Sequence, residues 1–424
     1  MMPTGQQAHA KRKSLCPSFG ATGARSGRNA TRPAPVVGLG ARMKSQWLRF
    51  GPLAQAPPGR CDRKNQSLTE KQYSCIVSWR LEGRANRLHD GRTLMKHLMT
   101  ATALALFSAY ALPASAETLK VSSYLPPKHA LNAMIEQWGR ELAEKSGGSL
   151  TLELYPAAQL GPVNRQFDMA ASGAADITVV LHSATPGRFP MTELAGLPLA
   201  APSAGNASGI ASPRLTALAD EFLAGEHAGT RILWMAVTPP LKISLKKVEP
   251  TSLAVFKGLR IRYAGQVFQS VLESLGATPL PVPPAEVQEG LSKGIIDGTL
   301  FPYEALKAFD LGADLGYSME PGIASATFAV VMNQGRFDSL TAEQQALVVA
   351  TVGVDRAAAF GAMWDAGEEE GRAYVQSKGV KIVTLAEDQK AALFEAITPI
   401  IDATIAAVEA TGKPGRAFYT AYVQ

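Results

Sequence analysis

The chain has 424 residues and a formal net charge of +6, but its charges are unevenly distributed. Residues 1–94 contain 17 Lys and Arg against 4 Asp and Glu, a net charge of +13, whereas residues 117–424 contain 24 against 32, a net charge of −8. The basic balance therefore belongs to the front segment, and the rest of the chain carries no charge signal for binding nucleic acid.

The front segment, residues 1–94, consists of Gly, Pro, Ala and Arg clusters without helical or strand periodicity. We expect it to be a disordered extension, or sequence that is not normally translated. All three cysteines, Cys16, Cys61 and Cys75, lie in it. Residues 117–424 therefore exclude disulfides and thiolate metal sites.

Residues 95–116 have the layout of a secretory signal peptide. Lys96 follows Met95, an apolar run extends to Leu112, and Ala114-Ser115-Ala116 forms an A-x-A cleavage site. The alternative is a membrane anchor, but the run is short for a span of about 20 residues. We predict that Met95 is the true initiator and that the exported chain begins at Glu117, in the periplasm.

Residues 117–235 are predicted to form lobe I. Strand patterns at 118–124, 149–156 and 175–181 alternate with helical patterns, and this order predicts a parallel sheet. His129 and His182 each follow a strand, at the sheet edge where open parallel sheets bind ligands. We consider both as ligand contacts; the alternative is a partly buried histidine bonded to the backbone.

Residues 236–334 are predicted to form lobe II, which repeats the pattern of lobe I. Asp176 and Asp297 each follow a helix-ending glycine and precede a strand, and we assign both a structural role in the turn. The strand at 326–333 is expected to lead back to lobe I. Elements from about 335–424 are assigned to lobe I as well.

A proline-free stretch from Leu340 predicts one long helix that ends at Gly379 and braces both lobes. Thr341 and Gln344 fit its N-terminal capping box. The acidic run 368–370 is predicted to be a solvated helix face.

Motifs of nucleotide-binding, metalloprotease and serine-hydrolase sites are absent from residues 117–424. The three histidines there are not paired at metal-ligand spacing, so we predict no metal and no cofactor. The remaining candidates are Arg260 and Arg262 on one strand. Arg262 lies about 6–7 Å nearer the ligand-binding rim, and its guanidinium can fork onto a carboxylate. An inter-lobe salt bridge is the alternative.

The chain resembles the extracytoplasmic solute-binding proteins of tripartite ATP-independent periplasmic (TRAP) transporters, of the dicarboxylate-binding-protein type. The resemblance rests on the stretches "LKVSSYLPPKHALNAMIEQWGRELAEKSGGSLTLELYPAAQLG", "GAADITVVLHSATPGRFPMTELAGLPL", "FKGLRIRYAGQVFQSVLESLGATPLPVPPAEVQEGLSKGIIDG" and "FAVVMNQGRFDSLTAEQQ". It implies a two-lobe periplasmic-binding-protein-like α/β fold with a β-linked hinge and a long lobe-spanning helix. It also implies that lobe closure captures an organic acid, which is delivered to the membrane subunits of a TRAP transporter. Arg262 matches the family's carboxylate clamp, and Arg260 takes a supporting or structural role.

This chain departs from the family pattern beside Arg262. Phe301 replaces an asparagine found in many members, Tyr303 follows it, and Pro284 stands where many members have an aromatic residue. We therefore expect Phe301 and Tyr303 to wall the pocket, and the ligand to be a less polar monocarboxylate, such as an aromatic or branched 2-oxo or hydroxy acid.

Two other functions stay open from the residues alone: a secreted enzyme that acts on a small organic acid, and the binding subunit of an ATP-driven importer. The enzyme would need a nucleophile or metal constellation, and none is found in the sequence. We predict a monomeric binding protein with no nucleic-acid partner.

Overall fold

The computed structural model describes residues 116–202 and 205–424. The predicted extension, residues 1–94, and all of the predicted signal peptide except Ala116 lie outside these residues. Both stay predictions.

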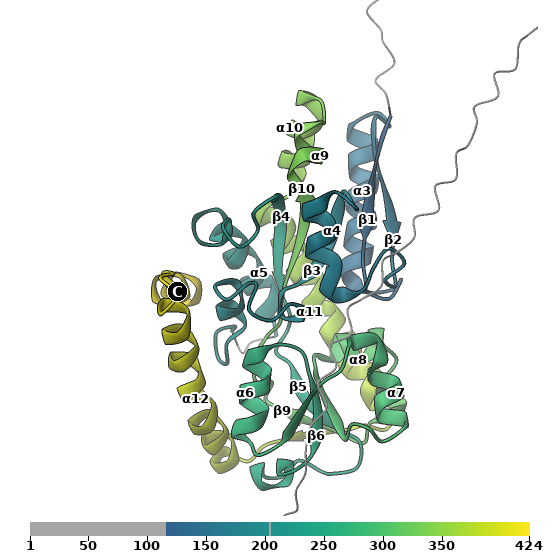
Figure 1. Ribbon diagram of the computed structural model, residues 1–424. Coiled ribbons are helices and arrows are strands. Elements are labelled where there is room, and N and C mark those ends of the chain that lie inside the picture. The colour runs from purple at the N-terminus through teal and green to yellow at the C-terminus, as the bar shows by residue number, and fades with distance from the viewer. Residues whose placement is uncertain (1–115, 203–204) are drawn as a thin grey trace, which may run out of the picture. The chain divides into compact units, whose positions relative to one another are not determined.

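Two β-sheets organise the described chain (Figure 1). The first sheet has the order β2-β1-β3-β10-β4 and the second has the order β11-β9-β5-β8-β6-β7. The first contains β1 (Glu117–Ser122), β2 (Leu150–Tyr155), β3 (Ile177–Leu181), β4 (Thr230–Val237) and β10 (Thr327–Asn333). The second contains β5 (Lys242–Leu245), β6 (Arg260–Tyr263), β7 (Thr278–Pro281), β8 (Gly298–Phe301), β9 (Tyr317–Glu320) and β11 (Lys381–Thr384). We call the first sheet and its helices lobe I, and the second sheet and its helices lobe II.

Helices follow the strands as the alternating sequence pattern predicts. They are α3 (Ala130–Lys145), α4 (Gln166–Ser172), α5 (Ala207–Ala217), α6 (Gln266–Ser274), α7 (Val287–Ser292), α8 (Tyr303–Ala308), α9 (Gln334–Asp338), α10 (Ala342–Thr351), α11 (Val354–Ser377), α12 (Glu387–Glu409) and α13 (Gly415–Val423). In lobe I, β1 pairs in parallel with β2 and β3, and in lobe II, β6 pairs in parallel with β7 and β8. The predicted two-lobe α/β fold class is confirmed.

The lobes are joined by two chain segments that run side by side, as a β-linked hinge requires. One connects β4 to β5, and the other connects β9 to β10. The backbone N–H of Thr238 donates to Ala326 O at 2.9 Å, and that of Leu241 donates to Ala324 O at 2.8 Å. The two crossings therefore form one hydrogen-bonded ribbon.

Two strands lie in the sheet opposite to the one that the predicted domain boundaries assigned them. β10, counted with lobe II by the boundary at residue 334, pairs antiparallel with β3 and β4 in lobe I. β11, counted with lobe I, pairs in parallel with β9 in lobe II. Each strand completes the sheet that its preceding segment reaches, so the chain crosses between lobes more often than the boundaries allowed.

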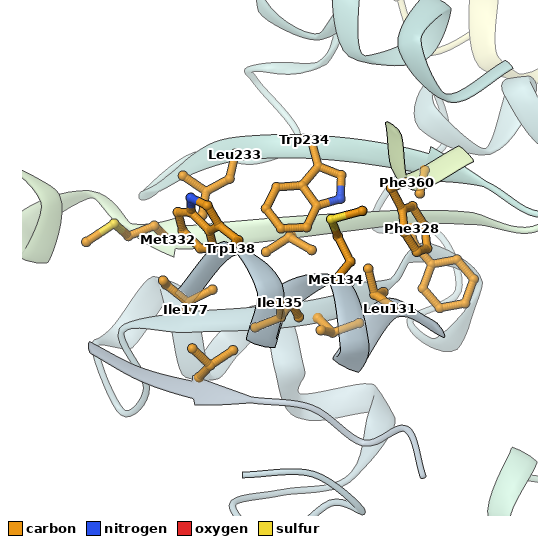
Figure 2. Packing of buried hydrophobic residues seen from close by; sticks show 14 of the residues in the cluster. Leu131, Met134, Ile135, Trp138, Ile177, Leu233, Trp234, Phe328, Met332 and Phe360 are labelled. Carbon is orange, nitrogen blue, oxygen red and sulfur yellow. The ribbon is translucent and has the colours of Figure 1, made fainter. Parts of the chain in front are cut away.

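The core of lobe I forms between α3 and the strands of its sheet. Figure 2 shows Leu131, Met134, Ile135 and Trp138 of α3 facing the sheet, at the helical spacing that predicted this helix. Trp138 packs edge-to-face on Trp234 of β4, with ring centroids 5.6 Å apart. The hydrophobic face of this amphipathic helix thus packs on one face of the lobe I sheet.

The predicted long lobe-spanning helix is confirmed in α11, but its predicted start is wrong, because the residues from Ala342 to Thr351 form a separate helix, α10. The two axes are bent by 43° at Val352 and Gly353. Gly353 has φ 86° and ψ −150°, a backbone conformation that glycine adopts without steric cost. The predicted capping box at Thr341 and Gln344 is confirmed at the start of α10.

Helix α11 packs on both lobes through two glycines. A Cβ added at Gly361 would lie 2.4 Å from Ser208 O in α5 of lobe I, and one at Gly371 would lie 2.4 Å from Tyr303 O in α8 of lobe II. Only glycine permits these approaches, so α11 lies directly against the backbone of each lobe.

The acidic run on α11 is only partly solvated, which corrects the prediction. Glu368 is buried, accepts the N–H of Glu304 at 2.9 Å and pairs with Lys242. One turn earlier, Asp365 accepts the N–H groups of Ser208 at 2.9 Å and of the next residue at 2.7 Å. These carboxylates satisfy N-terminal N–H groups of α8 and α5, so neighbouring turns of α11 hold one helix of each lobe.

Helix α12 also spans the lobes, which the sequence did not predict. Leu393 and Ile397 of its first half lie in the core of lobe II, and Ile405 and Val408 of its second half lie in a core cluster of lobe I. Figure 1 shows the helix running from one lobe to the other. The lobes are therefore tied by α11 and α12 as well as by the hinge.

Candidate functional site

An inner cavity of about 50 Å³ lies where the two lobes meet. Its polar lining consists of Tyr124, His129, Ser183, Thr238, Arg262 and Glu304. Its apolar lining consists of Leu125, Leu181, Leu241, Ala264, Phe268, Pro284, Leu300, Phe301, Pro302, Ala305, Phe309, Ala326, Phe328 and Trp364. The cavity is thus an apolar chamber with a few polar groups, the usual design of a small-molecule site.

Arg262 enters this cavity from β6, near the carboxyl end of the strand, where the sequence placed it. Its Nε donates to Val282 O at 2.9 Å, and its Nη1 approaches Leu300 O at 3.4 Å. The guanidinium carbon lies 4.1 Å from the centroid of the Phe301 ring. The stacking on Phe301 and the backbone hydrogen bond to Val282 O fix the orientation of the guanidinium plane before any ligand binds.

The Arg262 guanidinium is buried and incompletely satisfied. The residue is 2 % exposed, and its Nη2 has no hydrogen-bond partner among the described residues. Burial lowers the pKa of Arg262 to about 9, against the opposing effect of Tyr124, so the group remains a cation at neutral pH. A buried cationic N–H group without an acceptor is costly, and an anion in the cavity that accepts from Nη2 would remove that cost.

Arg260, two residues earlier, has a different environment. Its Nε and Nη2 donate to the two oxygens of Asp297, at 2.9 and 2.8 Å, and its side chain is 44 % exposed. Hydrogen bonds from Arg260 hold the pKa of Asp297 below its usual range. Arg260 is therefore committed to a surface ion pair, which agrees with its predicted supporting role.

His129 lines the cavity at the N-terminus of α3. Its Nδ1 accepts the backbone N–H of Leu131 at 3.1 Å, which makes His129 the N-cap of the helix. Its Nε2 lies 3.4 Å from Glu304 Oε1 in lobe II. Burial lowers the pKa of His129, against the opposing charge of Glu304. His129 thus combines both alternatives, a cavity position and a backbone hydrogen bond.

His182 and Tyr303 do not line the cavity. His182 is fully buried, and its ring nitrogens lie 3.0 Å from Thr327 Oγ1 and 3.1 Å from His227 Nε2. The hydroxyl of Tyr303 donates to Glu320 at 3.0 Å. Both side chains turn away from the cavity into the packing of their own lobes, because their chain neighbours occupy the cavity wall.

Those neighbours are residues that the sequence analysis missed. Ser183 follows His182, and Glu304 follows Tyr303, and both line the cavity. Glu304 Oε2 accepts the indole N–H of Trp364 from α11 at 3.0 Å. The carboxyl-end rule that singled out His182 could also have found Ser183, whereas Tyr303 was predicted from the departure from the family pattern, which gave no indication of Glu304. The helical pattern around Trp364 did not indicate that this residue would line a cavity.

Tyr124 completes the polar lining from the chain just after β1. Burial raises the pKa of Tyr124, with Arg262 opposing the shift and Glu304 adding to it. Its hydroxyl therefore stays protonated at neutral pH, in the field of one cationic and one anionic residue. An outer groove of about 450 Å³ shares Tyr124, Ser183 and Pro284 with the inner cavity and forms its approach.

Among residues 116–202 and 205–424, no group of three or more His, Cys, Asp or Glu side chains has the geometry of a metal site. The polar groups of the cavity are instead one guanidinium, one carboxylate, one imidazole and a few hydroxyls. This set can orient an anion by hydrogen bonds.

Comparison with known proteins identifies the family. Residues 121–407 match the model of the bacterial extracellular solute-binding proteins, family 7 (DctP). The chain belongs to this family. The predicted function, a binding protein that serves TRAP transport of an organic acid, is confirmed at the level of the family. The family is one of solute-binding proteins rather than enzymes, and its DctP members are periplasmic.

Individual relatives of this family-7 protein bind different solutes. The C4-dicarboxylate-binding periplasmic protein DctP of Rhodobacter capsulatus is 25 % identical, over 75 % of this chain and 98 % of its own length. A TRAP solute-binding protein of Bordetella bronchiseptica, solved with (R)- and (S)-mandelate, is 30 % identical, with a TM-score of 0.67, over 72 % of this chain and 98 % of its own. A marine-metagenome TRAP solute-binding protein described as specific for aromatic acids, solved with metahydroxyphenylacetate, is 28 % identical, with a TM-score of 0.68, over 72 % and 97 %.

Proposed function

We propose that this family-7 protein binds an aromatic monocarboxylate whose carboxylate is held by Arg262. The observation that carries the proposal is the buried guanidinium with a partnerless Nη2 at the wall of the inner cavity. The N–H groups of Nη2, together with an N–H group of Nη1, can donate hydrogen bonds to both oxygens of a carboxylate. His129 and Phe301 complete the proposed binding set, and His182 and Tyr303 are left out of it because they face away.

The walls of the cavity favour an aromatic ligand. Phe268, Phe301, Phe309 and Phe328 line it, and few polar groups interrupt them. An aromatic ring gains about 0.5–1.5 kcal/mol from such ring contacts beyond the burial of its area. The relatives solved with mandelate and with an aromatic hydroxy acid lend further support.

A second carboxylate on the ligand would be disfavoured. Among the described residues that line the inner cavity, Arg262 is the only arginine or lysine, and Glu304 lies in the same lining. A dicarboxylate would therefore bury a second negative charge beside an existing one without a cation to balance it. We infer that this chain differs in ligand from its C4-dicarboxylate-binding relative.

The finer parts of the predicted function belong to the same proposal. We infer that the signal peptide at 95–116 exports the chain, that a single copy closes on the acid, and that it releases the acid unchanged to the membrane subunits of a TRAP transporter. N-terminal sequencing of the exported protein, expected to begin at Glu117, tests the first point. Light scattering of the purified protein tests the monomer.

A thermal-shift screen tests the ligand class. We expect benzoate, phenylacetate, 3-hydroxyphenylacetate and mandelate to raise the melting temperature, and succinate to leave it unchanged. A ligand at 100 times its Kd adds about 2.7 kcal/mol of stability, which is a shift of several degrees for a domain of this kind. Stabilisation by succinate, with none by the aromatic acids, would overturn the proposal.

A further inference from the structure

Glu304 is a second buried charge in the inner cavity, and the function proposed above does not use it. It is 5 % exposed, and among the described residues no lysine or arginine nitrogen lies within 4.0 Å of its carboxylate. Buried carboxylates are ordinarily paired or fully hydrogen-bonded. Glu304 lines the same cavity as Arg262 without forming an ion pair with it, so its remaining partner is to be sought in the ligand.

The hydrogen bonds around His129 determine what it offers to Glu304. Because His129 Nδ1 accepts the N–H of Leu131, the proton of the neutral ring is on Nε2. Burial lowers the pKa of His129, which keeps the ring neutral. Nε2 therefore carries the N–H nearest to Glu304 Oε1, but the two atoms are 3.4 Å apart and do not form a hydrogen bond.

The two oxygens of Glu304 are unequally satisfied. Oε2 accepts a good hydrogen bond of 3.0 Å from Trp364 Nε1. Among the described residues, Oε1 has only the long contact with His129. A carboxylate oxygen can accept two hydrogen bonds, so Oε1 keeps a free acceptor position, in a residue that forms part of the cavity wall.

We propose that Glu304 Oε1 accepts a hydrogen bond from a hydroxyl group of the bound acid, so that the ligand class is hydroxylated aromatic monocarboxylates. This inference rests on the function proposed above and adds a second point of recognition to it. The carboxylate would then accept hydrogen bonds from Trp364 and from the ligand hydroxyl, with His129 Nε2 close by, and such hydrogen bonds stabilise a buried charge. An ammonium group fits less well, because it needs three acceptors and Glu304 has one free position.

Such a subsite would discriminate between related acids. An acid without the hydroxyl would shield Oε1 from water and give it no hydrogen-bond donor. The free-energy cost of this unsatisfied acceptor lowers the affinity for that acid and not for the hydroxy acids. Since hydrogen bonds to charged groups are the strong ones, we expect the hydroxyl to improve affinity by about 10-fold or more.

Calorimetry with four acids of matched size tests this subsite. Phenylacetate is the parent, 3-hydroxyphenylacetate and mandelate add a hydroxyl on the ring or beside the carboxylate, and phenylglycine places an ammonium where mandelate has its hydroxyl. On the wild-type protein we expect at least one hydroxy acid to bind about 10-fold more tightly than phenylacetate. In Glu304→Gln this advantage should fall to about threefold or less, because a neutral amide replaces the charged acceptor, while phenylacetate affinity changes less than about threefold.

Two control variants exclude a general disturbance. Glu286→Gln changes an exposed carboxylate in the outer groove and should keep the full hydroxyl advantage. Glu304→Asp keeps the charge but withdraws it by one methylene, and should give an intermediate advantage. Each variant is compared by its unliganded melting temperature, and Glu304→Asp carries the test if Glu304→Gln does not fold.

Each remaining outcome has a definite reading. An equal hydroxyl advantage in wild type and Glu304→Gln, an equal loss for parent and hydroxy acids, or tighter binding of phenylglycine than of mandelate overturns the proposed subsite. Wild-type binding of phenylacetate without any hydroxyl advantage overturns the subsite and leaves the aromatic-acid function standing. A wild-type protein that binds none of the acids overturns both.

Discussion

Lobe I and lobe II each contain the same pair of parallel strands, β1 with β3 and β6 with β8, and the same turn before the second strand of the pair. In lobe I, Asp176 accepts the backbone N–H of Lys120 in β1 at 2.8 Å. In lobe II, Asp297 accepts the backbone N–H of Arg260 in β6 at 2.9 Å. The structural role predicted for both aspartates is thus the same one, since each ties the strand that follows it to the neighbouring parallel strand.

Starting from these aspartates, the two strand pairs align residue by residue. Ser122 pairs with Thr178 in lobe I, and Arg262 pairs with Thr299 at the same place in lobe II. All four are buried. One position of a repeated frame therefore carries a small hydroxyl in lobe I and, in lobe II, the guanidinium that we propose binds the carboxylate.

A second pair shows the same asymmetry. Ser183 lies five residues after Thr178, and Glu304 lies five residues after Thr299, and both line the inner cavity. At these two positions lobe I contributes neutral hydroxyls and lobe II contributes both charges. Both lobes share this strand arrangement, and the proposed ligand recognition comes from these two positions, where lobe II has a charged side chain and lobe I has a serine.

The largest effect is expected at the first pair. Arg262→Ala removes the only arginine or lysine in the described cavity lining and should weaken aromatic-acid binding by about 100-fold or more, since a desolvated charge-assisted contact is lost. Ser122→Ala, the matched change in lobe I, should alter affinity by less than about threefold. Calorimetry on folded variants measures both, and a near-normal Kd for Arg262→Ala would refute the assignment.

The next effect concerns how α11 holds the two lobes. Gly361→Ala and Gly371→Ala each place a Cβ 2.4 Å from backbone atoms, one in each lobe. We expect each to cost about 3 kcal/mol of unfolding free energy, because overpacking exceeds the gain of about 1 kcal/mol that alanine brings to a helix. Urea unfolding measures this cost.

The exposed neighbour on the same helix serves as the control for both glycines. Glu369→Ala should stay within about 0.5 kcal/mol of wild type. Unchanged stability in either glycine variant would show that α11 does not press on that lobe.

Much of this architecture was predictable because it depends on local patterns. The alternation of strands and helices and the amphipathic helix α3 follow from side-chain periodicity. The carboxyl-end rule ranks Arg262 above Arg260, and this ranking stays a prediction. The break at Gly353 had a signal, a glycine after β-branched Val352, which the long apolar pattern concealed.

What could not be predicted depends on tertiary contacts. Whether Tyr303 or Glu304 faces the cavity depends on how the chain turns from β8 into α8. If α8 were rotated about its axis by one residue position, Tyr303 would take the place of Glu304 in the cavity wall. The burial of Glu368, within a run of three glutamates, depends on Lys242 and on the N-terminus of α8, which lie far away in sequence. The periodicity of a sequence does not indicate contacts between residues that are far apart in the chain.

A smaller effect is expected from a carboxyl group on the lobe I side of the interface. Glu193 lines a small gap that also contains Gly265 and Phe268 of lobe II. Burial raises the pKa of Glu193 to about 7, with Glu226 adding to the shift. A raised pKa means that the folded state binds this proton more tightly than the unfolded state, so stability is lost as pH rises from about 4.5 to 7.

Glu193→Gln removes this titration. The variant should match wild type near pH 4.5 and exceed it by about 2 kcal/mol above pH 7, a value reduced from the full shift because the side chain is partly exposed. Urea unfolding at several pH values measures the difference. A gap between wild type and variant that stays constant with pH would contradict the assignment.

The smallest effect separates the two arginines of β6. Arg260 pairs with Asp297, and in lobe I Arg336 pairs with Asp176 at 3.3 Å, so each lobe has an arginine on its turn aspartate. Because the Arg260 pair is half-exposed, Arg260→Ala should cost at most about 1 kcal/mol of stability. Arg260→Ala and Arg336→Ala should both leave the Kd for an aromatic acid within about threefold of wild type. If Arg260→Ala instead weakened binding as much as Arg262→Ala, position along the strand and the free Nη2 would not be what distinguishes the binding arginine, and the comparison of the lobes would lose its central pair.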